Sequence, residues 1–537
     1  MNLLHDLLDS AARRTPDGPA LRYRGAELTY ARLRQRSLEV AGALAALGVK
    51  RGDRIAICMQ NRPEVIELAL AASRLGAIFV PVNPILKRRQ LEHLLNDAGA
   101  TLLAASRGAT HALDELLDAC PTVRTLLLCD AGESPRLDGR ANVVDYETLA
   151  SAAAPPATAA IADDAAALLY TSGSTGRPKG VIVTHRNLVC GALSVSQYQR
   201  NHANDRILAA LPLSFDYGFS QVTIAFAVGA CAVLTNFALP AALVQEAQAE
   251  RITGLAGVPT MWMHLAAMEW PAAVAKSLRY ITNSGGVMPQ AVLARLRAAL
   301  PDTQVFCMYG FTEAFRSTYL EPSELDRRPG SIGKAIPGQE IFVLRADGTP
   351  CAPGEVGELV HRGSLVTLGY WRDPEKSARR FRSLPPRLSE IPRSEIAVWS
   401  GDLARTDEDG YLYFVARGDD LIKSSGYRIS PAEIEEVVAE VRGVVESAAI
   451  GLADESLGHK VVVALVAAPD AAREIAEMVR QHCRVQLPSY MLPADVHVLT
   501  ALPRNANGKC DRPALAAQLA QLPPTQCATM RHAHDAR

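Results

Sequence analysis

Hydrophobic and polar positions in the first half of the chain alternate between two periods. From Leu33 to Leu47 apolar residues recur at helical spacing, and Gly48 follows as a stop signal. Residues 53–58 form a short apolar run typical of a strand, and Pro63 to Leu75 returns to helical spacing. Helix and strand recur in this order, which predicts α/β folding with parallel, doubly wound sheets.

The pattern changes further along the chain. Residues 151–167 are rich in Ala and Pro without apolar periodicity, which predicts a surface connection. From Ile341 to Tyr413 the segments shorten and turn pairs such as Asp347-Gly348 multiply, so we expect a small β-rich lobe. A compact region follows Asp419 and ends near Leu519.

Composition and charge restrict the function classes. A chain of 537 residues is too long for one core and should form several lobes. Lys and Arg total 56 against 57 Asp and Glu, without a basic stripe, so nucleic acid is not an expected partner. The longest apolar stretch, residues 222–234, is too short for a membrane span. Ten cysteines without a C-x-x-C pair suit reduced thiols, and we expect a cytoplasmic protein.

The strongest chemical signal is a loop rich in glycine and hydroxyl residues at 168–181 (LLYTSGSTGRPKGV). An apolar strand enters this loop and a second strand, residues 181–183, leaves it. Glycines let backbone N–H groups turn toward an anion, the hydroxyls add donors, and Lys179 adds positive charge. The loop lacks the Walker A spacing, because Gly180 follows Lys179. It predicts a phosphate cradle, with a plain Ser/Gly surface loop as the alternative.

Residues 171–180 (TSGSTGRPKG) resemble the signature of the adenylate-forming superfamily of acyl-CoA synthetases, amino-acid adenylation domains and luciferases. Later motifs follow in the family's order, so the resemblance covers nearly the whole chain. It implies that the nucleotide phosphates are bound by Thr171, Ser172, Gly173, Ser174, Thr175, Gly176 and Lys179.

Three further motifs resemble the family's nucleotide-binding segments. Residues 309–313 (YGFTE) imply that Tyr309 offers a face to adenine, Thr312 a hydroxyl to phosphate and Glu313 a carboxylate to magnesium. In residues 284–287, Gly285 and Gly286 would lie close to the adenine and the acyl group. In residues 399–403, Asp402 would accept the ribose hydroxyls; Ser400 stands where the family usually has threonine.

Residues 417–435 are readable in part without any family. Ser430 is a good N-cap, Pro431 suits the first helical position and Glu433 completes a capping box. The remainder resembles the family's hinge motif. The implied nucleotide contacts are Arg417 at the ribose, Lys423, and Arg428 at the phosphates. Asp419 would be the hinge, and Gly426 would leave room for a pantetheine arm.

Residues 502–512 (LPRNANGKCDR) resemble the motif that carries the family's catalytic lysine. A mobile ammonium that reaches the carboxylate and the α-phosphate can hold the developing negative charge. Lys509 follows a glycine and suits that role. The resemblance therefore implies a large AMP-binding domain (1–418), a small mobile α+β domain with the catalytic lysine (419–520) and a flexible tail (521–537).

The acyl-binding segment leaves the substrate open. Acyl-CoA synthetases commonly have Leu-Pro-Leu-Phe-His here, whereas residues 211–218 read LPLSFDYG, so Phe215 takes the place of the histidine. Ser-Phe-Asp resembles amino-acid adenylation domains, in which the aspartate pairs with the α-ammonium. Asp216 either meets a positive group of the substrate or caps the following turn.

From these motifs we expect an AMP-forming ligase that adenylates a carboxylic acid and passes it to a thiol. The cofactors implied are ATP, Mg²⁺ and either CoA or a carrier-protein phosphopantetheine. An amino-acid adenylating enzyme that loads a carrier protein is the alternative, and the pattern is also similar to exosortase-associated ligases. A nucleotide-binding protein without catalysis and a luciferase-like oxidase are alternatives from other classes.

Overall fold

The computed structural model describes residues 1–521 apart from 87, 107–112, 131–139, 152–158, 172–177, 237–238, 386–394, 418–421, 425–426, 455–457, 470–473, 488–490 and 506–507. At 89, 113–114, 150–151, 416–417, 423, 427–428 and 458 it describes the backbone only. The chain divides into two units, Met1–Met288 with Val292–Phe414, and Pro289–Ala291 with Val415–Arg537.

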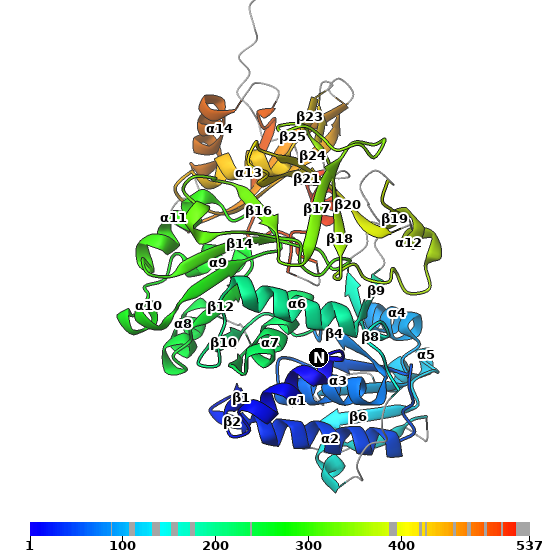
Figure 1. The fold of residues 1–537 in the computed structure, drawn as a ribbon. Helices are drawn as coiled ribbons and strands as arrows, with labels where there is room; N and C mark the ends of the chain where they lie inside the picture. The colour runs from blue at the N-terminus through cyan, green and yellow to red at the C-terminus, as the bar shows by residue number, and fades with distance from the viewer. Residues whose placement is uncertain are drawn as a thin grey trace, which may run out of the picture. The chain divides into compact units, whose positions relative to one another are not determined.

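A seven-stranded sheet forms part of the first unit (Figure 1), with the strand order β7-β6-β5-β3-β4-β8-β9. Neighbouring strands are parallel except for the antiparallel pair β8–β9. The strands are β3 (Arg54–Cys58), β4 (Ile78–Val82), β5 (Leu102–Ser106), β6 (Thr125–Cys129), β7 (Asn142–Asp145), β8 (Ala165–Thr171) and β9 (Lys179–Thr184). The associated helices are α2 (Tyr30–Ala46), α3 (Pro63–Leu75), α4 (Arg88–Ala98), α5 (Leu113–Ala119) and the 3₁₀ turn η2 (Tyr146–Ser151).

Side chains of this sheet point alternately to two separate cores. Ile55 and Ile57 pack into the large core that holds α2 and α3, while Ala56 and Cys58 pack into a second core with α4 and α5. This alternation follows from the two-residue period of a strand, and it confirms the predicted helices on both faces. α3 begins at Pro63 and ends at Leu75 as predicted, because Gly76 adopts a left-handed conformation (φ 66°) that closes the helix.

A second, 14-stranded sheet combines parallel and antiparallel parts. β1, β11, β10, β12, β13 and β14 are parallel neighbours, and β2 pairs antiparallel at the edge. Beyond β14 the neighbours are antiparallel, so the predicted β-rich lobe continues this sheet through β15, β16 and β21. The strands are β1 (Pro19–Tyr23), β2 (Ala26–Thr29), β10 (Arg206–Ala209), β11 (Cys231–Leu234), β12 (Gly254–Gly257), β13 (Tyr280–Asn283), β14 (Gln304–Tyr309), β15 (Thr318–Leu320), β16 (Ser331–Ala335), β17 (Gln339–Leu344), β18 (Gly357–Gly363), β19 (Phe381–Ser383), β20 (Ile396–Thr406) and β21 (Leu412–Arg417).

Helices α6 (His185–Tyr198) and α7 (Asp216–Val228) pack side by side in the large core (Figure 1). Gly229 ends α7 in a left-handed conformation and β11 follows at once, so residues 222–234 are a buried helix–turn–strand. The remaining helices of the chain's first 414 residues are α1 (Leu4–Arg14), α8 (Pro240–Ala249), α9 (Pro259–Leu265), α10 (Ala272–Ser277), α11 (Gln290–Ala299), η3 (Pro322–Glu324) and α12 (Pro374–Arg380).

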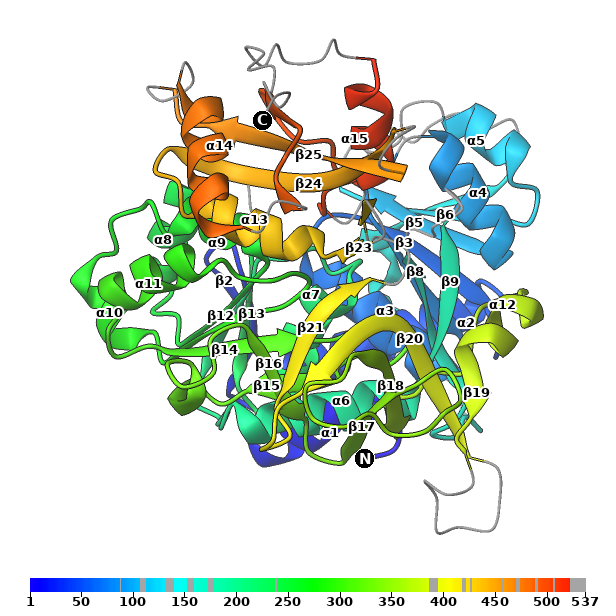
Figure 2. The same cartoon turned by 90° about the horizontal axis from the view of Figure 1, so that it is seen from above.

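The second unit is a five-stranded sheet with helices on both faces (Figure 2). Along its central strand β25, Val461, Val463 and Leu465 face α13 and α14, whereas Val462 and Ala464 face α15. Its elements are β22 (Ile422–Ser424), β23 (Tyr427–Ile429), α13 (Pro431–Ala439), β24 (Val444–Asp454), β25 (Gly458–Ala467), α14 (Ile475–Gln486), β26 (Asp495–Val498) and α15 (Arg512–Leu519).

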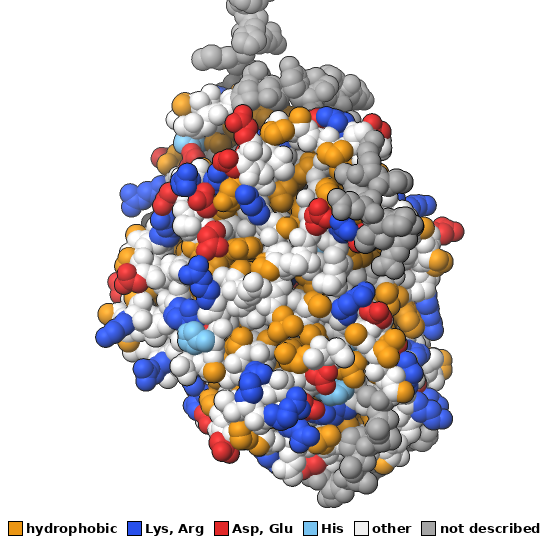
Figure 3. All heavy atoms as spheres, in the orientation of Figure 1, with side chains coloured by type: hydrophobic (Ala, Val, Ile, Leu, Met, Phe, Trp, Pro, Cys, Tyr) orange, Lys and Arg blue, Asp and Glu red, His pale blue; other side chains and the backbone are white. Residues whose placement is uncertain are grey.

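The surface carries charges of both signs. On the face drawn in Figure 3, Lys and Arg side chains are interspersed with Asp and Glu. Within the described residues, no helix is long and apolar enough to cross a membrane.

Candidate active site

A cation, a phenol and a carboxylate meet where two of the predicted motifs come together. Lys179 begins β9, and its Nζ donates to the Tyr370 hydroxyl at 2.8 Å. That hydroxyl donates in turn to Glu313 Oε1 at 2.5 Å, and Lys179 Nζ lies 3.4 Å from the same oxygen. The Lys179 ammonium also sits 4.1 Å from the centre of the Tyr370 ring. The structure thus joins the lysine of the phosphate cradle to the carboxylate predicted for magnesium.

Glu313 is held in its charged form. Burial alone would raise the pKa of its carboxyl, but the Lys179 ammonium and the Tyr370 hydroxyl outweigh burial and keep the pKa below its ordinary value. An ionised carboxylate with several oxygen lone pairs is the type of ligand that Mg²⁺ takes from proteins.

Tyr370 is a site residue that sequence reasoning missed. It lies in residues 367–371, which run along β9: Trp371 N donates to Gly180 O, and Ile182 N donates to Gly369 O. Thr367 holds the neighbouring motif, since both its N and its Oγ1 donate to Glu313 O. No local pattern marks this segment in the sequence, because its role arises from its position between two distant motifs.

The predicted phosphate cradle is only partly described. Residues 172–177, which include the predicted contacts Ser172, Gly173, Ser174, Thr175 and Gly176, lie outside the described residues. Thr171 ends β8, and its Oγ1 is buried without a hydrogen-bond partner in the described part of the chain. A buried orphan hydroxyl at the mouth of a glycine-rich loop suits a ligand with phosphate oxygens.

Tyr309 and Asp402 are in direct contact. The Tyr309 hydroxyl donates to Asp402 Oδ2 at 2.6 Å, although the two motifs are far apart in sequence. Ser400 supports this arrangement: its Oγ donates to Leu359 O and accepts from Asp402 N at 3.1 Å. A serine hydroxyl therefore suffices where the family usually has threonine.

Each residue of the pair Gly285–Gly286 has a structural reason to be glycine: a positive φ at the first and little room for a side chain at the second. Gly285 has φ +84°, and a Cβ on Gly286 would lie 3.0 Å from Pro259 Cγ. Asn283, at the end of β13, donates from Nδ2 to Gly286 O at 3.0 Å. Its Oδ1 is buried and accepts no hydrogen bond from any described residue.

Phe215 and Asp216 lie at the start of α7. Phe215 is the N-cap and packs against the large core, and Asp216 is the first helical residue and only 6% exposed. Asp216 Oδ1 accepts from Tyr217 N at 2.7 Å, and its Oδ2 accepts from Thr312 Oγ1 at 3.1 Å. The helix N-terminus also favours a negative charge there. The aspartate therefore has protein partners and touches the threonine predicted to contact phosphate.

The second unit contains the remaining predicted residues. Asp419 and Gly426 lie outside the described residues, and of Arg417, at the end of β21, only the backbone is described. Lys423 and Arg428 are register partners in the antiparallel pair β22–β23. The predicted capping box at α13 is wrong: Ser430 is the N-cap and Pro431 starts the helix, but Ser430 Oγ donates to Val415 O at 2.5 Å. That backbone oxygen takes the hydroxyl away from the helix N–H groups and links the start of α13 to β21.

Lys509 lies on a tight turn and is exposed. Asn505 N donates to Lys509 O, Lys509 N donates to Asn505 Oδ1, and Gly508 takes φ +75° to close the turn. Arg504 anchors the turn to β24 through Glu446, at 2.7 Å. The backbone of the predicted catalytic lysine is therefore fixed within its own unit.

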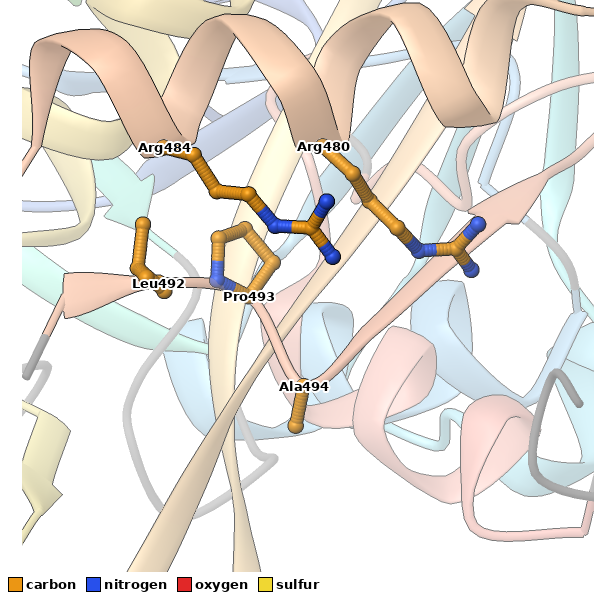
Figure 4. A pocket seen from close by; sticks show the side chains of 5 residues that line it. All are labelled: Arg480, Arg484, Leu492, Pro493 and Ala494. Atoms are coloured by element: carbon orange, nitrogen blue, oxygen red, sulfur yellow. The ribbon is translucent and has the colours of Figure 1, made fainter. Parts of the chain in front are cut away.

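A small pocket elsewhere in this unit is lined by Arg480, Arg484, Leu492, Pro493 and Ala494. The two arginines lie one turn apart on α14 and extend over the segment 492–494 (Figure 4). Arg480 is paired with Glu477, at 3.4 Å. None of the predicted site residues lines this pocket.

Comparison with known proteins identifies the class. Residues 8–371 match the model of the AMP-binding enzyme family, and residues 433–509 match the AMP-binding enzyme C-terminal domain. The chain belongs to the AMP-binding enzyme family.

Its relatives include ligases for CoA and for carrier proteins. It is 34% identical to a feruloyl-CoA synthase of Amycolatopsis over 93% of this chain and 95% of that one. It is 32% identical to an L-proline–[L-prolyl-carrier protein] ligase of Pseudomonas fluorescens over 97% and 100%. A linear gramicidin synthase of Brevibacillus parabrevis is 32% identical over 96% of this chain, which spans only 6% of that much longer protein.

Among solved structures, o-succinylbenzoate CoA synthetase of Bacillus subtilis with its acyl-adenylate superposes with a TM-score of 0.82, at 28% identity over 97% of this chain and 99% of that one. The same enzyme with ATP and magnesium gives a TM-score of 0.79, at 29% identity over 95% and 98%. The protein is thus an AMP-forming acid–thiol ligase: it uses ATP and Mg²⁺ to adenylate a carboxylic acid and transfers the acyl group to the thiol of CoA or a carrier protein.

Proposed function

We propose that the first unit binds ATP and the acid through the residues gathered around Glu313, and that the second unit supplies Lys509 for adenylation. The observation that carries this proposal is the contact of Lys179, Tyr370 and Glu313. It brings a cation and an ionised carboxylate from two separate motifs to one place, as a magnesium–phosphate site requires.

The nucleotide would be bound along the same cluster. Tyr309 and Asp402 would hold the adenosine, with Arg417 also at the ribose, and Thr171, Lys179 and Thr312 would face the phosphates. Glu313 would hold Mg²⁺, which when bound supplies positive charge at the phosphate oxygens. The other nucleotide contacts in this proposal are Ser172, Gly173, Ser174, Thr175, Gly176, Gly285, Gly286 and Lys423.

Two half-reactions follow from this assignment. In the first, the acid's carboxylate attacks the α-phosphorus of ATP and pyrophosphate leaves, with Lys509 and Arg428 stabilising the developing charge. In the second, the domain 419–520 turns about Asp419 and withdraws Lys509. A thiol admitted past Gly426 then attacks the acyl carbon, and AMP leaves.

The test separates the two half-reactions. Lys509→Ala should lower ATP–pyrophosphate exchange by about 100-fold or more while largely sparing thioester formation from a preformed acyl-adenylate. Lys460→Ala serves as a matched control, because that lysine of the same unit is paired with Asp495 at 2.9 Å. Equal loss of both half-reactions in Lys509→Ala would contradict the proposed division of labour.

An amino-acid adenylating enzyme that loads a carrier protein is the second candidate. It is favoured by the buried Asp216 at the start of α7 and by the full-length match to the prolyl-carrier protein ligase. ATP–pyrophosphate exchange limited to amino acids and abolished in Asp216→Ala would establish it. Two results together would exclude this candidate. The wild-type enzyme would catalyse exchange with acids that lack an amino group, and Asp216→Ala would change the exchange rate by the same factor for every acid.

We also place the enzyme in the cytoplasm. Nine cysteines among the described residues are free thiols, and most are buried, as suits a compartment that keeps thiols reduced.

A further inference from the structure

Arg316 is a buried cation that the proposed reaction does not yet use. It is 3% exposed and follows Glu313 by three residues, in the connection between β14 and β15. Its Nη2 donates to Ser220 Oγ at 2.9 Å, and its guanidinium carbon lies 4.4 Å above the centre of the Tyr217 ring. Its Nε is buried and has no acceptor among the residues that the structure describes. Among the described residues, no carboxylate forms an ion pair with it.

Arg74, the other buried arginine among the described residues, has the carboxylate partner that Arg316 lacks there. Arg74, 7% exposed, is held by both oxygens of Asp9 at 2.6 and 3.1 Å and also donates to Ser37. A guanidinium carries five N–H donors, and a buried charge is costly unless a counter-charge meets it. A serine hydroxyl and an aromatic face supply only part of that compensation at Arg316.

The backbone beside Arg316 is strained in a way that fixes its position. Phe315 has φ +55°, which is uncommon for an aromatic residue, and Arg316 N donates to Ala314 O at 2.6 Å across this turn. Phe315 is wedged against Gly191 on α6, where a Cβ would lie 2.8 Å from the ring. The turn therefore holds Arg316 against α7 at an energetic cost, and strain of this kind is concentrated at functional sites.

The contacts of Arg316 place it on the acyl side of the proposed site. Tyr217 follows Asp216 at the start of α7, and its hydroxyl lies 2.5 Å from Thr282 Oγ1 on β13. Thr282 immediately precedes Asn283, which donates to Gly286 O and whose Oδ1 is buried without a partner. One cluster thus contains a buried unpaired cation and a buried unpaired acceptor, next to the segments proposed to bind the acid.

We propose that the acid activated by this enzyme carries a second carboxylate, and that Arg316 binds it. A carboxylate accepts two parallel hydrogen bonds from a guanidinium and supplies the missing charge. This inference rests on the proposed function, in which the acid binds at the start of α7. Arg316 would then be a specificity residue that contacts the remote end of the substrate, while the reacting carboxylate faces ATP.

The test is ATP–pyrophosphate exchange with two series of matched acids. The first compares each diacid from malonate to adipate with the monoacid of the same chain length, from propionate to hexanoate. The second compares aspartate with asparagine and glutamate with glutamine. In the wild-type enzyme the kcat/KM of at least one diacid should exceed that of its monoacid or amide partner by about 100-fold or more, because a site built for a charged group rejects analogues without it. Arg316→Met should lower kcat/KM for the diacid by about 100-fold and leave the monoacid partner nearly unchanged. Arg316→Lys should restore part of the preference.

Arg74→Met is the control, since it removes a buried arginine that already has its carboxylate; it should lower stability and leave the diacid preference unchanged. Wild-type exchange with monoacids at least as good as with diacids would overturn the inference and leave the proposed function standing. An equal loss for both members of a pair in Arg316→Met would also overturn it. Exchange with no acid at all would refute the proposed function itself. Should Arg316→Met fail to fold, the wild-type preference and Arg316→Lys decide the question.

Discussion

The nucleotide side and the acyl side of the proposed site differ in how their charges are compensated. On the nucleotide side, Glu313 has Lys179 and Tyr370 within hydrogen-bond or ion-pair distance, and Asp402 has Tyr309. On the acyl side, Arg316 is more deeply buried, and its partners among the described residues are Ser220 and the rings of Tyr217 and Phe315, none of which carries a charge. The charges named in the first region are compensated by protein groups, whereas the second region leaves a charge for its ligand to neutralise.

This difference reflects what each region must recognise. Residues 8–371 match the model of the AMP-binding enzyme family, and one solved relative holds ATP and magnesium, so the nucleotide side can be built from family motifs whose members support one another. The acid differs between relatives, from ferulate to proline, so the acyl side must vary. Substitutions on the nucleotide side should affect all acids alike, while substitutions on the acyl side should change which acid is used.

The largest effect is expected at Glu313. Glu313→Gln removes the charge that suits Mg²⁺ but keeps the size and the hydrogen bond from Tyr370. We expect kcat for ATP–pyrophosphate exchange to fall by about 1,000-fold with every acid, because the metal supplies charge stabilisation in the transition state. A magnesium titration measures the accompanying loss of metal affinity. A loss restricted to some acids would contradict the assignment of Glu313 to the nucleotide side.

Asp216→Asn should have the next largest effect. The amide retains a hydrogen-bond acceptor for Thr312 and Tyr217 N but loses the charge at the start of α7. Since Thr312 is proposed to contact phosphate, kcat/KM should fall by about 30-fold for acids with and without an amino group alike. Steady-state kinetics with glutarate and glutamate compare the two classes. Loss confined to glutamate would instead favour an amino-acid substrate paired with Asp216.

Tyr370→Phe removes one hydroxyl and keeps the ring under Lys179. The hydroxyl links Lys179 to Glu313, and charge-assisted hydrogen bonds of this kind contribute about 1.5–3 kcal/mol. We expect a loss of about 10-fold in kcat/KM for ATP, equal for all acids, because the direct Lys179–Glu313 ion pair at 3.4 Å does not depend on the hydroxyl. The matched control is Tyr319→Phe, a residue outside the site that stacks on Tyr198. An acid-dependent change in Tyr370→Phe would mean that the two sides are not separate.

The smallest effect concerns pH. His361 is fully buried and bridges Ser317, next to Arg316, to Gln339; burial lowers its pKa to about 3. Between that value and the ordinary pKa of about 6.5, the unfolded chain binds a proton that the folded chain does not, so stability falls as the pH falls. At pH 5.5 the loss is on the order of 1 kcal/mol relative to pH 8.

Denaturant unfolding of the wild type and His361→Gln at pH 8 and 5.5 tests this. The variant cannot titrate at this position, whereas His185, whose pKa burial lowers to about 4, contributes equally to both proteins. The wild type should therefore lose on the order of 1 kcal/mol more than the variant on acidification. An identical pH dependence in the two proteins would contradict a neutral, structurally required His361.

The order of helices and strands was largely readable before the fold was known. α3 has its predicted bounds, because Pro63 and Gly76 are strong local start and stop signals. The capping box at Ser430 was wrong because the hydroxyl found a partner, Val415 O, that no local rule contains. Tyr370 and Arg316 were not predicted for the same reason: their roles depend on contacts with residues far away in sequence.

The sequence by itself determined the α/β class, the succession of elements and the reaction class, because periodicity, turn residues and short motifs act over a few neighbouring positions. Only the tertiary structure decided which motifs touch: Lys179 with Glu313, Tyr309 with Asp402, and Thr312 with Asp216. It also decided that Arg316 is buried without a carboxylate partner among the described residues. Burial and charge pairing depend on where distant segments pack, and that is a property of the folded chain rather than of any stretch of sequence.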